Sequence, residues 1–257
     1  MIGIFDSGLG GLTAYRELHT LLPKEKFIYF GDTGRVPYGS RSREILTHYT
    51  RQDIQFLLSK GATSILAACG TVSSVVLDEV AKEYSLPIVG VVDASAKEAL
   101  AATQNGIIGV IGTGATVSSG AFEKKLTAGG AAKVVSVACP LFVPLVENGY
   151  IARDCEVTRL VAKDYLSKIK ESGADTLILG CTHFPIIADL IGDLLPGVTL
   201  VNSGAAAAKA VAKTVTCPTE GESEFYVSDS PVNFDAVARI FLGGDTVKAE
   251  RVDIEKY

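Results

Sequence analysis

Short apolar runs alternate with segments of helical periodicity along most of the chain. The apolar runs predict buried strands at 2–5, 27–30, 63–68, 88–91, 107–111, 133–137, 175–179 and 198–201. Between them, apolar residues recur at three- and four-residue spacing, which predicts amphipathic helices over 43–59, 72–84, 154–171 and 205–215. Strands and helices that alternate in this way are typical of parallel sheets with helices on their faces. The pattern therefore predicts an α/β fold with mainly parallel sheets.

Two stretches of the sequence occur twice, in the same order. GATSILAAC at 61–69 returns as GADTLILGC at 173–181, and IGIFDSG at 2–8 returns as IGVIGTG at 108–114. Each half thus opens with a strand that runs into a Ser/Thr-Gly turn, and a later strand runs into a cysteine. If the two halves face each other, as duplicated α/β units often do, Cys69 and Cys181 meet across one cleft from opposite sides.

The repeat also predicts how the chain divides into domains. The first half ends near residue 95 and the second near residue 204, with no linker or low-complexity segment between them. EFYVSD at 224–229 and a short predicted helix over 233–242 have no counterpart in the second half. We therefore expect one α/β domain from residues 1–95 together with 205–257, where the C-terminal segment packs back, and a second from residues 96–204.

Side chains with useful chemistry follow the predicted strands. In open α/β sheets, ligands bind beyond the carboxyl ends of the strands, so these residues predict a shared site. They are Ser7, Asp32, Cys69, Thr113, Cys181 and Asn202. A cysteine between a strand and a helix lies near the positive end of the helix, which predicts a lowered thiol pKa. Thr71 and Thr182 add hydroxyl donors beside the two thiols.

Two thiols on opposite sides of a cleft suit a reaction in which a proton leaves one face of a carbon and returns to the other. The alternative is that a cysteine after a buried strand is an inert small hydrophobic residue. We keep that interpretation for Cys139, Cys155 and Cys217. The repeat, the strand-end position and the nearby threonines favour catalysis by Cys69 and Cys181.

His183 follows Cys181 by two positions, and its near-neutral pKa suits it as a proton partner for a thiol. We expect Asp6, at the end of the first strand, to occupy the place in the first half that mirrors His183 in the second. Without that comparison, Asp6 would be interpreted as a turn or cap residue. His19 and His48 lie in predicted helices and are expected to be surface or packing residues.

Composition and charge narrow the classes of function. The chain has 257 residues, of which 47% are hydrophobic and 21% charged, as expected for a globular protein. A net charge of -5 without a dense Lys/Arg stripe argues against a nucleic-acid binder, so we expect a small-molecule partner. The sequence has no predicted membrane span and no signal-peptide pattern at Met1, from which we expect a cytoplasmic protein without a membrane partner.

Cysteine spacing and glycine-rich turns exclude several kinds of site. The 5 cysteines are widely separated and form no C-x-x-C pair, which argues against a disulfide framework and a zinc or other metal site. DSGLGG at 6–11 and GTGATV at 112–117 do not complete the G-x-G-x-x-G pattern of dinucleotide sites. A nucleotide cofactor is therefore weakly supported.

Four motifs together resemble the glutamate racemases of the cofactor-independent aspartate/glutamate racemase superfamily. They are DSGLGGLT at 6–13, GDTGRVPYGSRS at 31–42, ACGT at 68–71 and GCTHFP at 180–185, and the resemblance covers essentially the whole chain. It implies two α/β domains related by a pseudo-twofold axis, an active site in the interdomain cleft, no cofactor and a homodimer. It also implies a role in supplying D-glutamate for peptidoglycan synthesis.

The same resemblance implies roles for individual residues. Cys181 would remove the proton from L-glutamate and Cys69 from D-glutamate, with Asp6 and His183 as their acid/base partners. Glu147, in PLVENG at 144–149, matches a family acid near that histidine. The positions that would hold the substrate are Ser7, Pro37, Tyr38, Gly39, Gly70, Thr71, Thr113, Thr116 and Thr182.

One position departs from the family pattern, because the usual Cys-Asn-Thr is here Cys69-Gly70-Thr71. The missing carboxamide would help to bind the substrate's α-carboxylate and amine, at a cost of about 1.5 to 3 kcal/mol if nothing replaces it. Glycine leaves room for water or for a closer approach of the backbone N–H groups of residues 70 and 71. We therefore expect an active racemase whose pocket is rearranged near Gly70.

The departure keeps two alternatives open. The first is a related racemase that acts on aspartate or another acidic substrate. The second is a catalytically silent paralogue that only binds an amino acid or a protein partner. The two thiols in matched settings, Cys69 and Cys181, argue against the silent paralogue.

Overall fold

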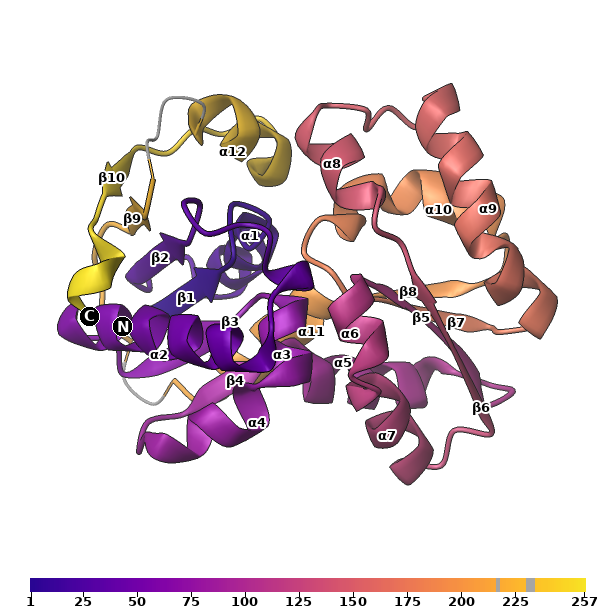
Figure 1. The fold of residues 1–257 in the computed structure, drawn as a ribbon, viewed down its shortest axis with the longest axis horizontal. Helices are drawn as coiled ribbons and strands as arrows, with labels where there is room; N and C mark the ends of the chain where they lie inside the picture. The colour runs from indigo at the N-terminus through magenta and orange to yellow at the C-terminus, as the bar shows by residue number, and fades with distance from the viewer. Residues whose placement is uncertain (216–217, 230–233) are drawn as a thin grey trace.

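The computed structural model describes residues 1–215, 218–229 and 234–257, and it contains two parallel sheets flanked by helices (Figure 1). The first sheet has the order β10-β9-β2-β1-β3-β4. Its strands are β1 (Ile2–Asp6), β2 (Phe27–Gly31), β3 (Ser64–Ala67), β4 (Ile88–Gly90), β9 (Glu224–Val227) and β10 (Ala249–Arg251). The second has the order β6-β5-β7-β8, with β5 (Ile107–Gly112), β6 (Lys133–Ala138), β7 (Thr176–Leu179) and β8 (Thr199–Asn202). The predicted α/β class with mainly parallel sheets is confirmed.

The sequence repeat is also a repeat of strand pairing. β1 pairs with β3 so that Ile2 lies opposite Ser64, and β5 pairs with β7 so that Ile108 lies opposite Thr176. These are matching positions of the two repeated segments. The order β2-β1-β3-β4 accordingly corresponds to β6-β5-β7-β8 in the second sheet.

The register corrects one prediction about equivalence. With the repeats matched in this way, the counterpart of His183 is Thr71, and the counterpart of Asp6 is Gly112. The prediction that Asp6 mirrors His183 was therefore wrong, because Asp6 ends β1 whereas His183 follows β7, whose counterpart is β3.

The helices fill the connections between strands. They are α1 (Leu12–Leu21), α2 (Arg43–Ser59), α3 (Gly70–Val75), α4 (Leu77–Val80), α5 (Val91–Ala102), α6 (Gly114–Ser118), α7 (Ala121–Ala128), α8 (Phe142–Glu147), α9 (Glu156–Ser172), α10 (Ala188–Leu194), α11 (Ser203–Ala212) and α12 (Phe234–Leu242). α2 has the predicted bounds, and α9 and α11 are shifted by a few residues. Residue 233 of the predicted helix over 233–242 lies outside the described residues.

The single helix predicted over 72–84 was wrong, because the chain forms α3, α4 and the 3-10 turn η2 (Ala81–Glu83) there. Val76 leaves the helical conformation between α3 and α4, with φ -129° and ψ -20°. Ser73 Oγ donates to the Ala67 carbonyl at 3.0 Å and accepts from the Val91 N–H at 3.2 Å. Serine bonds of this kind, next to β-branched residues, compete with a continuous helix.

The C-terminal segment extends the first sheet. β9 lies parallel to β2 with Glu224 opposite Ile28, and β10 adds beyond it. α12 follows β9 and lies at the top of Figure 1, on the side that α8 of the second half approaches. The division into domains at residues 95 and 204 stays a prediction.

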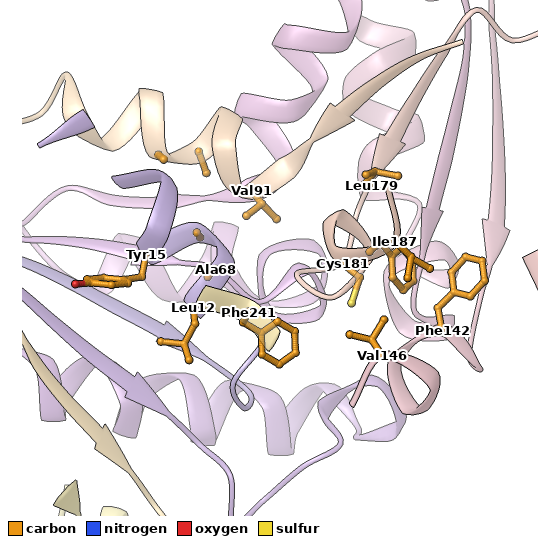
Figure 2. Close-up of a cluster of buried hydrophobic side chains, with 14 of the residues drawn as sticks. Leu12, Tyr15, Ala68, Val91, Phe142, Val146, Leu179, Cys181, Ile187 and Phe241 are labelled. Atoms are coloured by element: carbon orange, nitrogen blue, oxygen red, sulfur yellow. The ribbon is translucent and has the colours of Figure 1, made fainter. Parts of the chain in front are cut away.

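A continuous apolar core joins the two halves. One cluster of buried side chains includes Leu12 and Tyr15 of α1, Phe142 of α8, Leu179 of β7 and Phe241 of α12, and Figure 2 shows part of it. Burying a side chain of this size stabilises the fold by about 1.5 to 3 kcal/mol.

In the part of the chain that the structure describes, no helix combines the length and the apolar character needed to span a bilayer.

Candidate active site

A cavity of about 470 Å³ lies at the carboxyl ends of strands from both sheets. All but two of the site residues that the racemase resemblance implied line it. From the first half these are Ser7, Pro37, Tyr38, Gly39, Cys69, Gly70 and Thr71, and from the second half Thr113, Glu147, Cys181, Thr182 and His183. The fold therefore brings both repeated thiols to one cavity, each as the second residue after its strand.

Two predicted residues lie beneath the cavity wall instead. Asp6 and Thr116 are each 1% exposed and do not line the cavity. Thr116 Oγ1 is 3.0 Å from Thr113 Oγ1, so Thr116 orients the Thr113 hydroxyl, which lines the cavity. Asn202, which the strand-end argument placed in the shared site, instead caps α11 by accepting from the N–H groups of Gly204 and Ala205.

The segment after β2 forms one wall of the cavity, through Val36, Pro37, Tyr38, Gly39 and Ser40. The Val36-Pro37 peptide bond is cis. The Tyr38 hydroxyl points away from the cavity, donates to Asp32 Oδ2 and lies 3.1 Å from Asp53 Oδ2. Asp32 therefore anchors this wall and does not line the cavity, which corrects its predicted place in the shared site.

Arg35 joins the buried carboxylates behind this wall. Its Nε lies 2.6 Å from Asp32 Oδ2, and its Nη2 lies 3.2 Å from Asp53 Oδ1. Burial, followed by the charge of Asp32, raises the pKa of Asp53 well above its ordinary value. The buried contacts of Arg35 and Tyr38 with both of these carboxylates fix the Tyr38 ring.

The sequence analysis missed a second wall, formed by the segment after β6. Cys139, Pro140, Val143 and Pro144 line the cavity there, with Glu147 at the end of α8. The available signal was the repeat itself, because β6 corresponds to β2, and the segment after β2 was already predicted to hold substrate. Cys139 is fully buried, and burial raises the pKa of its thiol to about 12.

Cys69 is held as a neutral thiol. It is the N-cap of α3, is 5% exposed, and donates to Ser7 Oγ at 3.7 Å. Burial, and then the negative charge of Asp6, raise the pKa of Cys69 to about 12. The predicted lowering of its pKa was therefore wrong, because burial outweighs the N-terminus of a single short helix. The lowered thiol pKa belongs instead to Cys155, through the N–H and hydroxyl groups of Thr158.

Cys181 has a different partner, the buried imidazole of His183. Cys181 Sγ lies 3.8 Å from His183 Nδ1, and His183 Nε2 lies 2.9 Å from Glu147 Oε1. Burial lowers the pKa of His183, but the contacts with Cys181 and Glu147 overcome it and raise that pKa to about 10. His183 is thus an imidazolium at neutral pH. Phe241 of α12 packs edge-on against its ring, with 5.1 Å between ring centroids, and was not predicted.

Asp6 connects the surroundings of the two thiols. Its Oδ2 accepts from the Gly8 N–H at 3.1 Å, and within the described residues its Oδ1 has no hydrogen-bond partner. Burial raises the pKa of Asp6, and the positive charge of His183 opposes that rise. The carboxyl is therefore placed to take up or release a proton behind the cavity wall.

Hydrogen bonds next to the cavity tie the two halves together. Thr71 Oγ1 lies 3.0 Å from Thr113 Oγ1, and Thr13 Oγ1 donates to the Thr182 carbonyl at 3.1 Å. Across residues 1–215, 218–229 and 234–257, no group of three or more His, Cys, Asp or Glu side chains is arranged to hold a metal ion.

This geometry is accompanied by close likeness to known racemases. The family model for Asp/Glu/hydantoin racemases matches residues 13–211. The glutamate racemase of Geobacter metallireducens is 42% identical over 263 residues, covering 99% of this chain and 97% of that protein. The glutamate racemase of Aquifex aeolicus is 42% identical over 242 residues, covering 94% of each chain.

Solved structures agree with the sequence comparison. The crystal structure of Francisella tularensis glutamate racemase in complex with D-glutamate has a TM-score of 0.90 at 35% identity, and covers 100% of this chain and 98% of that one. The aspartate racemase of Picrophilus torridus, with a TM-score of 0.59 at 20% identity over 83% of this chain and 93% of that one, shares the fold. By its sequence and by its full-length fold, this chain belongs to the Asp/Glu/hydantoin racemase family.

Proposed function

We propose that this protein is a cofactor-independent glutamate racemase, an isomerase that interconverts L- and D-glutamate by proton transfer between Cys69 and Cys181. The observation that carries the proposal is that both thiols line one cavity, reached from two separate sheets. Full-length relatives named glutamate racemase support the choice of substrate, as does the Francisella tularensis structure with D-glutamate.

In the direction from L-glutamate to D-glutamate, Cys181 acts as the base. The His183 imidazolium, which Glu147 holds in place, stabilises a thiolate at Cys181. The Cα–H bond of the substrate breaks and its proton forms an S–H bond on Cys181. The neutral thiol of Cys69 then gives its proton to the opposite face of Cα, so one proton leaves the carbon and one returns.

In the reverse direction the two thiols exchange roles. Cys69 must lose its proton before it can act as a base, and the buried carboxyl of Asp6 interacts with it electrostatically. We propose Asp6 as the group that accepts this proton, and His183 as the group that keeps Cys181 supplied with one. Both auxiliary residues therefore act on the charge state of a thiol.

The hydroxyl groups around the cavity bind the substrate in this proposal. Ser7, Thr71, Thr113 and Thr182 offer donors and acceptors for the carboxylates and the amine, and Thr116 orients Thr113. These donors also stabilise the negative charge that spreads into the carboxylate when the Cα proton leaves. Pro37, Tyr38, Gly39 and Gly70 shape the wall around the substrate.

The test follows the optical activity of L-glutamate, and separately of D-glutamate, with purified protein, a reducing agent and no pyridoxal phosphate. Both enantiomers should converge to the racemate. Cys69→Ser and Cys181→Ser should each lower kcat by about 10³-fold or more, because the weaker acid serine cannot replace the thiol. Thermal unfolding by circular dichroism should give similar midpoints for all three proteins.

The remaining outcomes separate the alternatives. If only aspartate converges to its racemate, the two-thiol mechanism is retained and glutamate is rejected as the substrate. Full activity in both serine variants would overturn the mechanism. No turnover of either amino acid by folded protein would favour the binding-only paralogue.

We further propose a cytoplasmic homodimer that supplies D-glutamate for peptidoglycan synthesis. Support for the dimer comes from large apolar side chains exposed around α9. Leu141 and Tyr150 precede the helix, and Val157 and Leu160 lie three residues apart on it, with Leu160 72% exposed. A second copy of the chain that covers this patch would remove it from water.

A further inference from the structure

Gly70 and Gly180 bring the two halves into backbone contact beside the thiols. A side-chain carbon on Gly70 would overlap the carbonyl oxygen of Gly180, and would lie 3.8 Å from the Cα of Cys181. The residue after Cys69 therefore packs directly on the residue before Cys181. Real side-chain carbons do not approach a carbonyl oxygen so closely, so a larger residue at position 70 forces the backbones apart.

Neither backbone segment can easily move aside on its own. The Gly180 N–H donates to the Ile111 carbonyl of β5 at 2.8 Å, at the end of the second sheet. Gly70 is the first residue of α3, and its carbonyl accepts from Ser74 Oγ at 2.6 Å. Thr71, the residue after Gly70, joins the two halves again through its hydrogen bond with Thr113. A residue with a side chain at position 70 would therefore shift α3 against β7, and the two thiols with them.

The contact also changes the interpretation of the Cys69-Gly70-Thr71 motif. The place that the first side-chain carbon of residue 70 would take is occupied by the Gly180 carbonyl. A carboxamide at position 70 would start in that space and could not reach the substrate without separating the two halves. Contacts to the substrate on this side must come from groups such as the Thr71 and Thr113 hydroxyls, which line the same cavity.

We infer that Gly70 is a positioning residue, whose contact with Gly180 sets the distance between the thiols of Cys69 and Cys181. This inference rests on the proposed two-thiol racemase and deepens it. Proton transfer to and from one carbon requires both sulfurs at fixed, opposite positions, and a displacement of about 1 Å can cost 10²-fold in rate.

The experiment compares Gly70→Asn and Gly70→Ala with the wild type and with Gly192→Ala. Gly192 lies in α10, and a side-chain carbon there would have its nearest neighbour at 3.9 Å. Both Gly70 variants should lose about 10- to 100-fold in kcat, with a smaller change in KM, for L- and D-glutamate. The kinetic isotope effect of α-deuterated glutamate should rise, because proton transfer becomes more rate-limiting. Gly192→Ala should stay within about twofold of the wild type.

A second measurement does not depend on racemase activity. Homobifunctional thiol-alkylating reagents of increasing length are applied, and peptides that join Cys69 to Cys181 are quantified by mass spectrometry. The length that gives the most cross-link should be longer in both Gly70 variants than in the wild type and in Gly192→Ala. If Gly70→Asn does not fold, Gly70→Ala, which adds a single carbon, carries the comparison.

The two measurements separate the inference from the proposed function. An unchanged optimum length together with unchanged kcat in folded Gly70→Ala would overturn the positioning role, even if the wild type racemises glutamate. A wild type that does not racemise glutamate would overturn the proposed function, while a shifted optimum length would still support the contact as the determinant of thiol separation.

Discussion

At the scale of single residues, the two thiols differ in their neighbours. Cys69 faces the hydroxyl of Ser7 and the charge of Asp6, whereas Cys181 faces the His183 imidazolium. The strand-end position predicted both thiols, because it depends only on the order of residues along the chain. Their charge states could not be predicted, because burial and neighbours come from segments distant in sequence.

His183 predicts a pH-dependent part of the stability. Its pKa in the folded protein, about 10, lies above its ordinary value of 6.5. Its contribution is therefore fully present below about pH 6.5 and is lost as the pH rises through 10. The gap in urea midpoint between the wild type and His183→Gln should be largest at pH 6 and should shrink towards pH 10.

The matched control is His48→Gln, which removes an exposed histidine of α2. Its gap to the wild type should be small throughout this pH range. A His183→Gln gap that stays constant from pH 6 to pH 10 would contradict a protonated His183 in the folded protein.

At the scale of elements, the turns after strands build the site, and the turn between β1 and α1 illustrates how. Gly10 lies against the segment after β7, where a side-chain carbon would overlap Thr182 Oγ1 and lie 2.6 Å from His183 Nδ1. The DSGLGG turn is thus shaped to fit the GCTHFP turn of the other half. In the sequence its glycines served as part of the racemase resemblance and as a failed nucleotide motif, but their role in packing could not be predicted because their packing partner was unknown.

Gly10→Ala should therefore displace Thr182 and His183 and lower kcat/KM by about 10²-fold, although no catalytic side chain is removed. Steady-state kinetics with each enantiomer measures the change, and circular dichroism checks that the fold is retained. Activity close to the wild type in folded Gly10→Ala would mean that the two turns can separate without disturbing His183.

At the scale of the whole molecule, much of the fold followed from the sequence. The strands predicted between residues 2 and 201 agreed with the structure to within one residue at each end, because buried strands of parallel sheets are short apolar runs, whereas β9 and β10 were not predicted. Short helices such as α8 and α10 were missed, because six or seven residues are too few to show helical periodicity. Cys139 and its neighbours were missed as cavity residues, because the apolar segment after β6 carries no catalytic side chain type beyond one cysteine.

The proposed homodimer is tested by substitution within the exposed patch around α9. Leu160→Asp should raise the dimer dissociation constant about tenfold or more, because a charge replaces apolar area that the partner would cover. Light scattering coupled to size exclusion, over a range of concentrations, measures it. Leu21→Asp, at an exposed leucine of α1, is the control. A monomeric wild type at all concentrations would overturn the dimer.

The matched strand registers of the two halves have a further consequence. Duplication placed one thiol after β3 and one after β7, but the equivalent positions two residues beyond the thiols hold different side chains, Thr71 and His183. L- and D-glutamate have the same free energy in water, so the equilibrium constant of their interconversion is one. Microscopic reversibility then requires kcat/KM to be equal in the two directions for any arrangement of side chains. The asymmetry of this site can therefore appear only in kcat and KM taken separately. The enantiomer with the larger kcat must also have the larger KM, by the same factor.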